Sequence, residues 1–182
     1  MALIDRLVLD LDPLRTSREF RYIFTARVVS LFGLGFLVVA VPLQVYRLTG
    51  STAQVAAVSA VLGVTTFAAT FAGGVLADRY DRRRVIALAR GTAGVAFAVL
   101  AVNAFLPDPK MWIVYVAAVI DGVCGGISAT ALMAVTPSLL PREKMAAAGA
   151  LMALTGDLGA MIGPALGGVV IATGGVGVAY AL

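Results

Sequence analysis

The chain has 182 residues, of which 60% are hydrophobic and 13% are charged. Soluble domains are about half apolar and about a quarter charged, so this composition excludes an ordinary soluble enzyme and predicts a polytopic membrane protein. The sequence has no His and one Cys. These counts exclude a His/Cys metal site, a haem site, a Cys/His nucleophile pair and a disulfide within the chain. We therefore expect no metal, no cofactor and no enzymatic activity.

Five segments are long and apolar enough to supply the roughly 20 residues that a helix needs to cross a bilayer. We expect residues 1–22 to form a short amphipathic lead-in on the cytoplasmic side. The predicted helices of the bundle that follows, 23–182, are 23–46, 55–77, 85–106, 111–136 and 145–173, and a sixth begins at 177. The connections are short and rich in Gly and Pro, so we expect each to join antiparallel neighbours.

Basic residues alternate between the connections, and this pattern predicts the orientation because cytoplasmic loops collect Lys and Arg. The connections with most positive charge hold Arg6, Arg15, Arg18 and Arg21, then Arg79, Arg82, Arg83 and Arg84, then Arg142 and Lys144. The net charge of +4 is explained by this pattern and does not indicate a nucleic-acid partner. We expect the N-terminus in the cytoplasm and the connections near Gly50 and Asp108 on the opposite side.

Four ionisable residues lie inside the predicted spans: Arg27, Arg90, Asp121 and Asp157. A charge at mid-helix costs about 2.5–3.5 kcal/mol on insertion scales, so such residues usually face the bundle interior or a water-filled cavity. Arg27 and Arg90 lie roughly 6–8 Å from the cytoplasmic ends of their helices. From there they can snorkel, so each is either a structural anchor or a contact for substrate or gate.

Asp121 and Asp157 lie near the midplane and cannot snorkel. One interpretation places both carboxylates at one cavity, where they carry protons or bind substrate. The alternative is structural pairing of Asp121 with Arg90 and of Asp157 with Arg27, which neutralises charge in the core.

The connection between the second and third predicted helices carries the sequence GVLADRYDRRR, from Gly74 to Arg84. A loop that only sets topology explains the arginines but not Asp78 and the glycine pair before it. This stretch resembles the GxLADRxGRR signature of the major facilitator superfamily, whose secondary transporters consist of two six-helix halves. The resemblance implies a cytoplasmic gate loop formed by Gly74, Asp78, Arg79, Asp81, Arg82 and Arg83. Asp81 departs from the signature, which has glycine there, and adds a carboxylate to the turn.

The fifth predicted helix carries GAMIGPALGG, which fills every position of the family's GxxxGPxxGG pattern, seen mostly in antiporters. Its members here are Gly159, Gly163, Pro164, Gly167 and Gly168. Glycines four residues apart let two helices approach to backbone contact, and Pro164 removes a hydrogen bond and permits a kink. Alone, the pattern would indicate simple helix packing; together with the loop signature it predicts a tightly packed hinge.

A third family pattern, an arginine followed by glycines in the fourth helix, is where this chain departs most. Asp121 stands at the arginine position, while Gly122, Gly125 and Gly126 keep the close-packing surface. The family's usual proton-coupling group is therefore replaced, and Asp121 is the candidate substitute.

Within the superfamily, the run GGVLADRYDRRRVIALARG resembles the branch of bacterial enterobactin exporters. The resemblance implies an inner-membrane carrier that exports a siderophore, a small-molecule substrate, from cytoplasm to periplasm. A drug or another amphipathic compound stays open as substrate. We expect an all-α integral membrane fold, the amino-terminal half of such a carrier, whose transport needs a missing carboxy-terminal half. The remaining alternative is a non-transporting membrane fragment of a split or disrupted gene.

Overall fold

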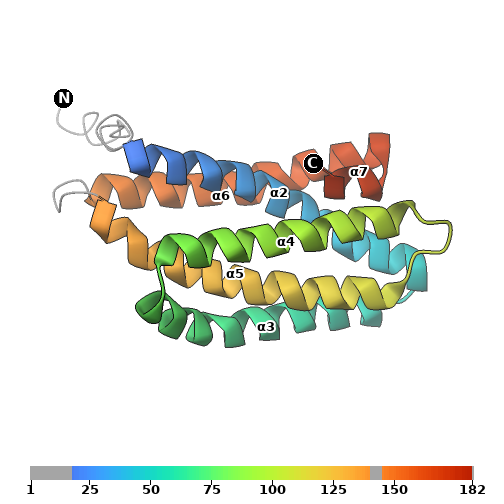
Figure 1. The fold of residues 1–182 in the computed structure, drawn as a ribbon. Helices are drawn as coiled ribbons and strands as arrows, with labels where there is room; N and C mark the ends of the chain where they lie inside the picture. The colour runs from blue at the N-terminus through green and yellow to red at the C-terminus, as the bar shows by residue number, and fades with distance from the viewer. Residues whose placement is uncertain (1–17, 140–144, 182) are drawn as a thin grey trace, which may run out of the picture.

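The computed structural model describes residues 18–139 and 145–181. Its helices are α2 (Arg18–Thr49), α3 (Thr52–Arg79), α4 (Arg82–Phe105), α5 (Met111–Leu139), α6 (Met145–Gly174) and α7 (Val176–Ala181) (Figure 1). Within the described residues, α2 to α6 are long and apolar enough to cross a membrane. This confirms the predicted fold class of five spans and the start of a sixth.

The ends of the helices follow from local signals in the sequence. The turn after α2 contains Gly50, whose φ of +62° is one that a residue with a side chain rarely adopts. Ser51 then caps α3, since its hydroxyl accepts a hydrogen bond from the N–H of Gln54 at 3.4 Å. Gly175, with a φ of +82°, separates α6 from α7 in the same manner. Residues 18–22, predicted as part of the lead-in, form the first turn of α2, and residues 1–17 lie outside the described part.

The connection between α4 and α5 is held by the side chain of Asn103, which is 1% exposed. Its Oδ1 accepts from the N–H of Lys110 at 2.8 Å, and its Nδ2 donates to the carbonyl of Lys110 at 3.3 Å. The ammonium of Lys110 in turn contacts the carboxylate of Asp108. The buried amide therefore finds both a donor and an acceptor in the turn that it closes.

The helices form two groups, with α2, α6 and α7 on one side of the bundle and α3, α4 and α5 on the other (Figure 1). The most extensive packing joins α3 to α5, α2 to α6 and α4 to α5, while α7 contacts α4 between the groups. Contacts between the consecutive helices α2 and α3, and between α3 and α4, are small. The short connection between α4 and α5 does join close neighbours, but those between α2 and α3 and between α3 and α4 do not, because a turn fixes only one end of a helix and the packing surface decides the rest.

Glycines form the surface between α2 and α6. A Cβ atom on Gly163 would lie 2.8 Å from the Cα of Gly35, and one on Gly167 would lie 2.9 Å from the Cα of Phe36. Real Cβ atoms do not approach other atoms this closely, so the two backbones touch only because these positions lack side chains. Gly35 on α2 is therefore the residue against which the glycine pattern of α6 packs.

Glycines also allow close backbone contact between α3 and α5. A Cβ atom on Gly126 would lie 2.6 Å from the carbonyl oxygen of Thr66, and one on Gly122 would lie 2.8 Å from that of Leu62. From the opposite helix, a Cβ atom on Gly73 would meet the backbone of α5 at 2.9 Å. These glycines bring α5 against α3 and leave its other face free to line the interior of the bundle.

The outer surface carries large apolar side chains. Phe67, Phe71 and Met161, for example, are 66%, 67% and 74% exposed. Water would not stabilise such a surface, whereas lipid chains or further membrane helices would. The distribution agrees with a multi-pass membrane protein.

Candidate functional site

A cavity with a volume of about 780 Å³ lies between α2, α4, α5 and α7. The polar side chains that line it are Ser30, Arg90, Asp121, Cys124, Ser128 and Tyr180. Asp121, Cys124 and Ser128 share one face of α5 because residues three, four and seven apart return to the same side of a helix. The cavity thus combines a polar stripe on α5 with a guanidinium from α4.

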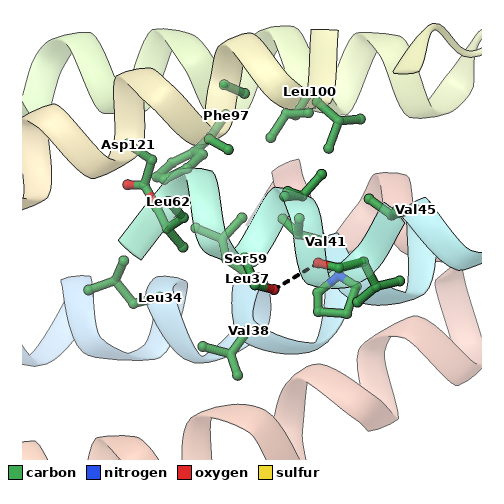
Figure 2. A pocket seen from close by; sticks show the side chains of 16 residues that line it. Leu34, Leu37, Val38, Val41, Val45, Ser59, Leu62, Phe97, Leu100 and Asp121 are labelled. Atoms are coloured by element: carbon green, nitrogen blue, oxygen red, sulfur yellow. Dashed lines mark hydrogen bonds between the residues drawn. The ribbon is translucent and has the colours of Figure 1, made fainter. Parts of the chain in front are cut away.

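A smaller cavity, of about 430 Å³, lies between α2, α3, α4 and α5 (Figure 2). Its described lining is apolar apart from Ser59 and Asp121. The hydroxyl of Ser59 is already engaged, because it donates to the carbonyl of Val55 at 3.0 Å. The carboxyl of Asp121 is therefore the ionisable group that this apolar space offers to a ligand.

Asp121 stands where the two cavities meet. Leu34, Leu37, Phe97 and Asp121 line both of them. Figure 2 shows the carboxyl of Asp121 beside the ring of Phe97 at one end of the apolar cavity. One carboxylate thus faces a polar space and an apolar space, and the ring of Phe97 forms part of the wall of each.

Arg90 is the charged neighbour of Asp121. Its guanidinium lies close enough to act electrostatically on the Asp121 carboxyl, and both side chains line the larger cavity. A half-buried carboxylate with a cationic neighbour avoids the full cost of an isolated charge in lipid. The structure thus brings together Asp121 and Arg90, two of the four ionisable residues predicted inside the spans.

The structure does not bring Asp157 to this site. Its side chain on α6 is exposed and lines neither cavity. The reason is that α6 packs mainly on α2 and α7, not on α5, so consecutive midplane carboxylates do not share a space. Arg27 lies in α2, but its side chain is outside the described part, so its predicted pairing with Asp157 stays a prediction.

Asp81, where the gate loop departs from the family signature, has a local role at the start of α4. Its carboxylate accepts a hydrogen bond from the N–H of Arg84 at 3.0 Å, which makes it the N-cap of the helix. An acidic N-cap satisfies an otherwise unpaired N–H and interacts favourably with the helix dipole. A glycine there would lack this side-chain hydrogen bond.

The other predicted gate residues lie around this cap. Arg79 and Arg83 are exposed and Arg82 is half-buried, while the side chain of Asp78 is outside the described part. A Cβ atom on Gly74 would meet no atom within 4 Å, so close packing falls on the preceding glycine instead. The gate role of this loop stays a prediction.

The predicted hinge glycines of α6 do not all lie on the surface that packs against α2. Gly159, Gly163 and Gly167 face α2, whereas a Cβ atom on Gly168 would meet nothing within 4 Å. Pro164 lies inside α6, directly after the crossing point at Gly163. Close packing with α2 therefore accounts for three of the four glycines, and Gly168 has no described contact that requires it.

Ser128 and Phe97 are among the cavity residues that the sequence analysis missed. Ser128 follows Asp121 by seven residues, so helical spacing alone would have placed both on one face. Phe97 gives no comparable signal, because a phenylalanine in a membrane span is ordinary. Its place beside Asp121 depends on how α4 packs against α5.

The chain is similar to a known protein family and to several curated proteins. The family model described as Major Facilitator Superfamily matches residues 23–182. The chain is 46% identical to the enterobactin exporter EntS of Citrobacter koseri and of Salmonella typhi, and 45% identical to that of Escherichia coli, each over 175 residues. These alignments cover 96% of this chain but 42% of each relative, so the chain spans less than half their length. No solved structure gave a significant match.

Proposed function

Because the chain belongs to the major facilitator superfamily, a family of transporters and not of enzymes, we propose that it forms the amino-terminal part of a secondary active exporter. The proposed cargo is a siderophore such as enterobactin, moved from the cytoplasm across the bacterial inner membrane. The observation that carries this proposal is 46% identity over 96% of the chain to proteins named enterobactin exporters.

Proton coupling through Asp121 is part of the proposal. A carboxylate that shares a cavity with a guanidinium can take up and release a proton, and the two states differ by one charge. Such a change alters which conformations of the surrounding helices are favourable. The support is the position of Asp121 beside Arg90 at the junction of two cavities.

Export of other amphipathic compounds is the second candidate. The apolar cavity of about 430 Å³ falls within the size range of sites for drug-sized ligands. It would bury an apolar group, with the carboxyl of Asp121 as its polar end. This feature favours a compound with an apolar body and a cationic or hydrogen-bonding group.

The transport cycle is proposed to need the remaining part of the carrier. Relatives are more than twice as long as the stretch they share with this chain, and carriers of this superfamily bind substrate between two six-helix halves. We place the N-terminus and the loop from Gly74 to Arg83 in the cytoplasm, where that loop would act as a gate against the second half.

A bacterium that makes enterobactin but lacks its own exporter would test the function. We expect the full-length carrier to restore catecholate in the medium, and this 182-residue stretch alone to leave secretion at the level of the empty vector. Equal membrane abundance, measured through an epitope tag, is the control. Failure of the full-length carrier to restore secretion would contradict siderophore export, and resistance to lipophilic dyes in its place would favour the second candidate. Proton-driven flux from the short stretch alone in liposomes would overturn the need for a second half.

A further inference from the structure

Ser128 holds a buried hydroxyl without a hydrogen-bond partner among the described residues. The residue is 2% exposed and lines the cavity of about 780 Å³ that also contains Asp121 and Arg90. A serine or threonine in a helix commonly donates to the carbonyl four residues earlier. Thr130, two residues further along α5, does so, with its hydroxyl 2.6 Å from the carbonyl oxygen of Gly126. The hydroxyl of Ser128 is instead left for an occupant of the cavity.

Water is the occupant whose chemistry fits. A buried water needs two to four polar partners, and a hydroxyl left without a partner in an apolar surrounding is unfavourable. Ser30, Arg90 and Asp121 supply further donors and acceptors around the same space. The volume is many times that of one water molecule. An apolar ligand would leave Ser128 unsatisfied, whereas a file of waters would satisfy it.

We propose that the cavity between α2, α4, α5 and α7 is hydrated, and that Ser128 and its waters relay protons between Asp121 and the cytoplasmic end of α5. The purpose and direction of this relay rest on the proposed function; the hydration does not. Ser128 follows Asp121 by seven residues, about 10 Å along the helix, so the two cannot bond directly and waters must lie between them.

The relay is balanced in atoms and charge. A proton leaves the Asp121 carboxyl for the first water, the last water gives a proton to the Ser128 oxygen, and the hydroxyl gives its own proton to a further water on its cytoplasmic side. The other ionisable side chains that line the cavity are Arg90, Cys124 and Tyr180. Arg90 holds its proton permanently, and the hydroxyl of Tyr180 donates to Oε1 of Gln44 at 2.7 Å. Asp121 is the carboxyl among the described lining residues, and we assign it the role of loading the relay.

The native Cys124 is a built-in probe of hydration, because it lines the cavity between Asp121 and Ser128. The test is the rate at which 2-aminoethyl methanethiosulfonate, a small water-soluble thiol reagent, labels Cys124 in the full-length carrier in inside-out vesicles. The matched control is Val95→Cys in a Cys124→Ser background, since Val95 is 66% exposed on α4 and lines neither cavity. We expect Cys124 to react at least about tenfold faster, because thiols ionise in water and not in lipid. Equal or slower labelling of Cys124 would mean a dry cavity and would overturn the proposal.

The relay itself is tested by separating net proton movement from substrate exchange in proteoliposomes of the full-length carrier. We expect Ser128→Ala to lower proton-driven substrate flux about tenfold while exchange at equal pH on both sides is kept, because exchange needs no net proton transfer. Ser128→Thr, which retains a hydroxyl, should restore the flux. Thr92→Val is the control, because the hydroxyl of Thr92 is used by its own helix, 2.9 Å from the carbonyl of Leu88. Wild-type flux in Ser128→Ala, or equal loss of flux and exchange, would overturn the relay, whereas absence of proton-driven flux in the wild type would count against the proposed function.

Discussion

At the scale of single residues, Asp121 is defined by what surrounds it more than by its depth. Asp157 is equally deep by helical rise, yet it is exposed and lines neither cavity. Asp121 lines the larger cavity together with Arg90, which acts on it electrostatically, and lines the smaller cavity together with Phe97. A carboxylate that borders both a polar and an apolar space can take up a proton and contact an amphipathic ligand, which is what the proposed function requires of it.

The first prediction concerns the charge of this carboxyl. Asp121→Asn keeps the size of the side chain and its hydrogen-bonding capacity but cannot take up and release a proton. We expect proton-driven export by the full-length carrier to fall by at least about tenfold, with insertion unchanged. The measurement is export normalised to the amount of carrier in the membrane. Asp157→Asn is the matched variant and should retain export; equal activity of Asp121→Asn and wild type would show that Asp121 is not the coupling group.

The second prediction concerns the cap of α4. Asp81→Ala removes the acceptor of the Arg84 N–H, and loss of such a cap typically costs about 1 kcal/mol. We expect a corresponding fall in the free energy of unfolding, measured by denaturant titration of the purified carrier in detergent. Asp81→Asn keeps an acceptor and should remain close to wild type. The cap assignment would be wrong if the alanine and asparagine variants were equally stable.

At the scale of helices, glycines decide which elements become neighbours. α2 meets α6 at Gly35 and Gly163, and α5 meets α3 at Gly122 and Gly126. In lipid there is little hydrophobic gain from bringing helices together, so close backbone packing has a large share in selecting partners. This is why the short connections predicted the packing of α4 on α5 but not the principal partners of α2 and α3, which are α6 and α5.

The third prediction follows from this packing. Gly163→Ala would place a Cβ atom 2.8 Å from the Cα of Gly35 and force α2 and α6 apart, and overpacking of this kind costs about 1–3 kcal/mol. Gly168→Ala, on the same helix, meets nothing within 4 Å and should be neutral or slightly stabilising. Thermal stability of both variants in the same detergent is the measurement. A Gly168→Ala variant as unstable as Gly163→Ala would show that packing on α2 is not what the motif supplies.

At the scale of the whole molecule, the bundle is one of two parts that a carrier of this superfamily brings together. The described residues provide a lipid-facing surface, two cavities and a capped basic loop between α3 and α4. Alternating access in this superfamily comes from rocking of one half against the other around a central site. The charge pattern of the connections predicts which side of the membrane each end of the bundle faces.

The fourth prediction tests this orientation. In the Cys124→Ser background we expect Ser51→Cys to react with a membrane-impermeant thiol reagent added to intact spheroplasts, and Arg79→Cys to react only after lysis. The reason is that Arg79 belongs to the most basic connection and Ser51 to a weakly basic one. Both positions flank helix ends, and Arg79 is exposed while Ser51 is half-buried, so labelling after lysis serves as the control for reactivity. The reverse pattern would place the N-terminus outside.

The amino-acid sequence alone was sufficient to predict the presence of five spans, the fold class and the family. Membrane insertion depends on the summed apolar character of about 20 consecutive residues, which is a local property that needs no knowledge of contacts. The motifs around Asp78 and Gly163 are likewise continuous in the chain, so their resemblance was visible without coordinates. Charges inside the spans could be found in the same way, because each is an isolated exception in an apolar run.

Which of those charges share a space depends on the packing of the helices. Asp121 meets Arg90 because α5 packs on α4, while Asp157 is carried away from both because α6 packs on α2. The unused hydroxyl of Ser128 and the wall formed by Phe97 became visible only with the cavities themselves. A cavity is what remains when helices from distant parts of the chain are held apart by side chains and drawn together at glycines. The position and lining of a cavity therefore depend on contacts between helices that are distant in the sequence, and no single segment of the sequence determines them.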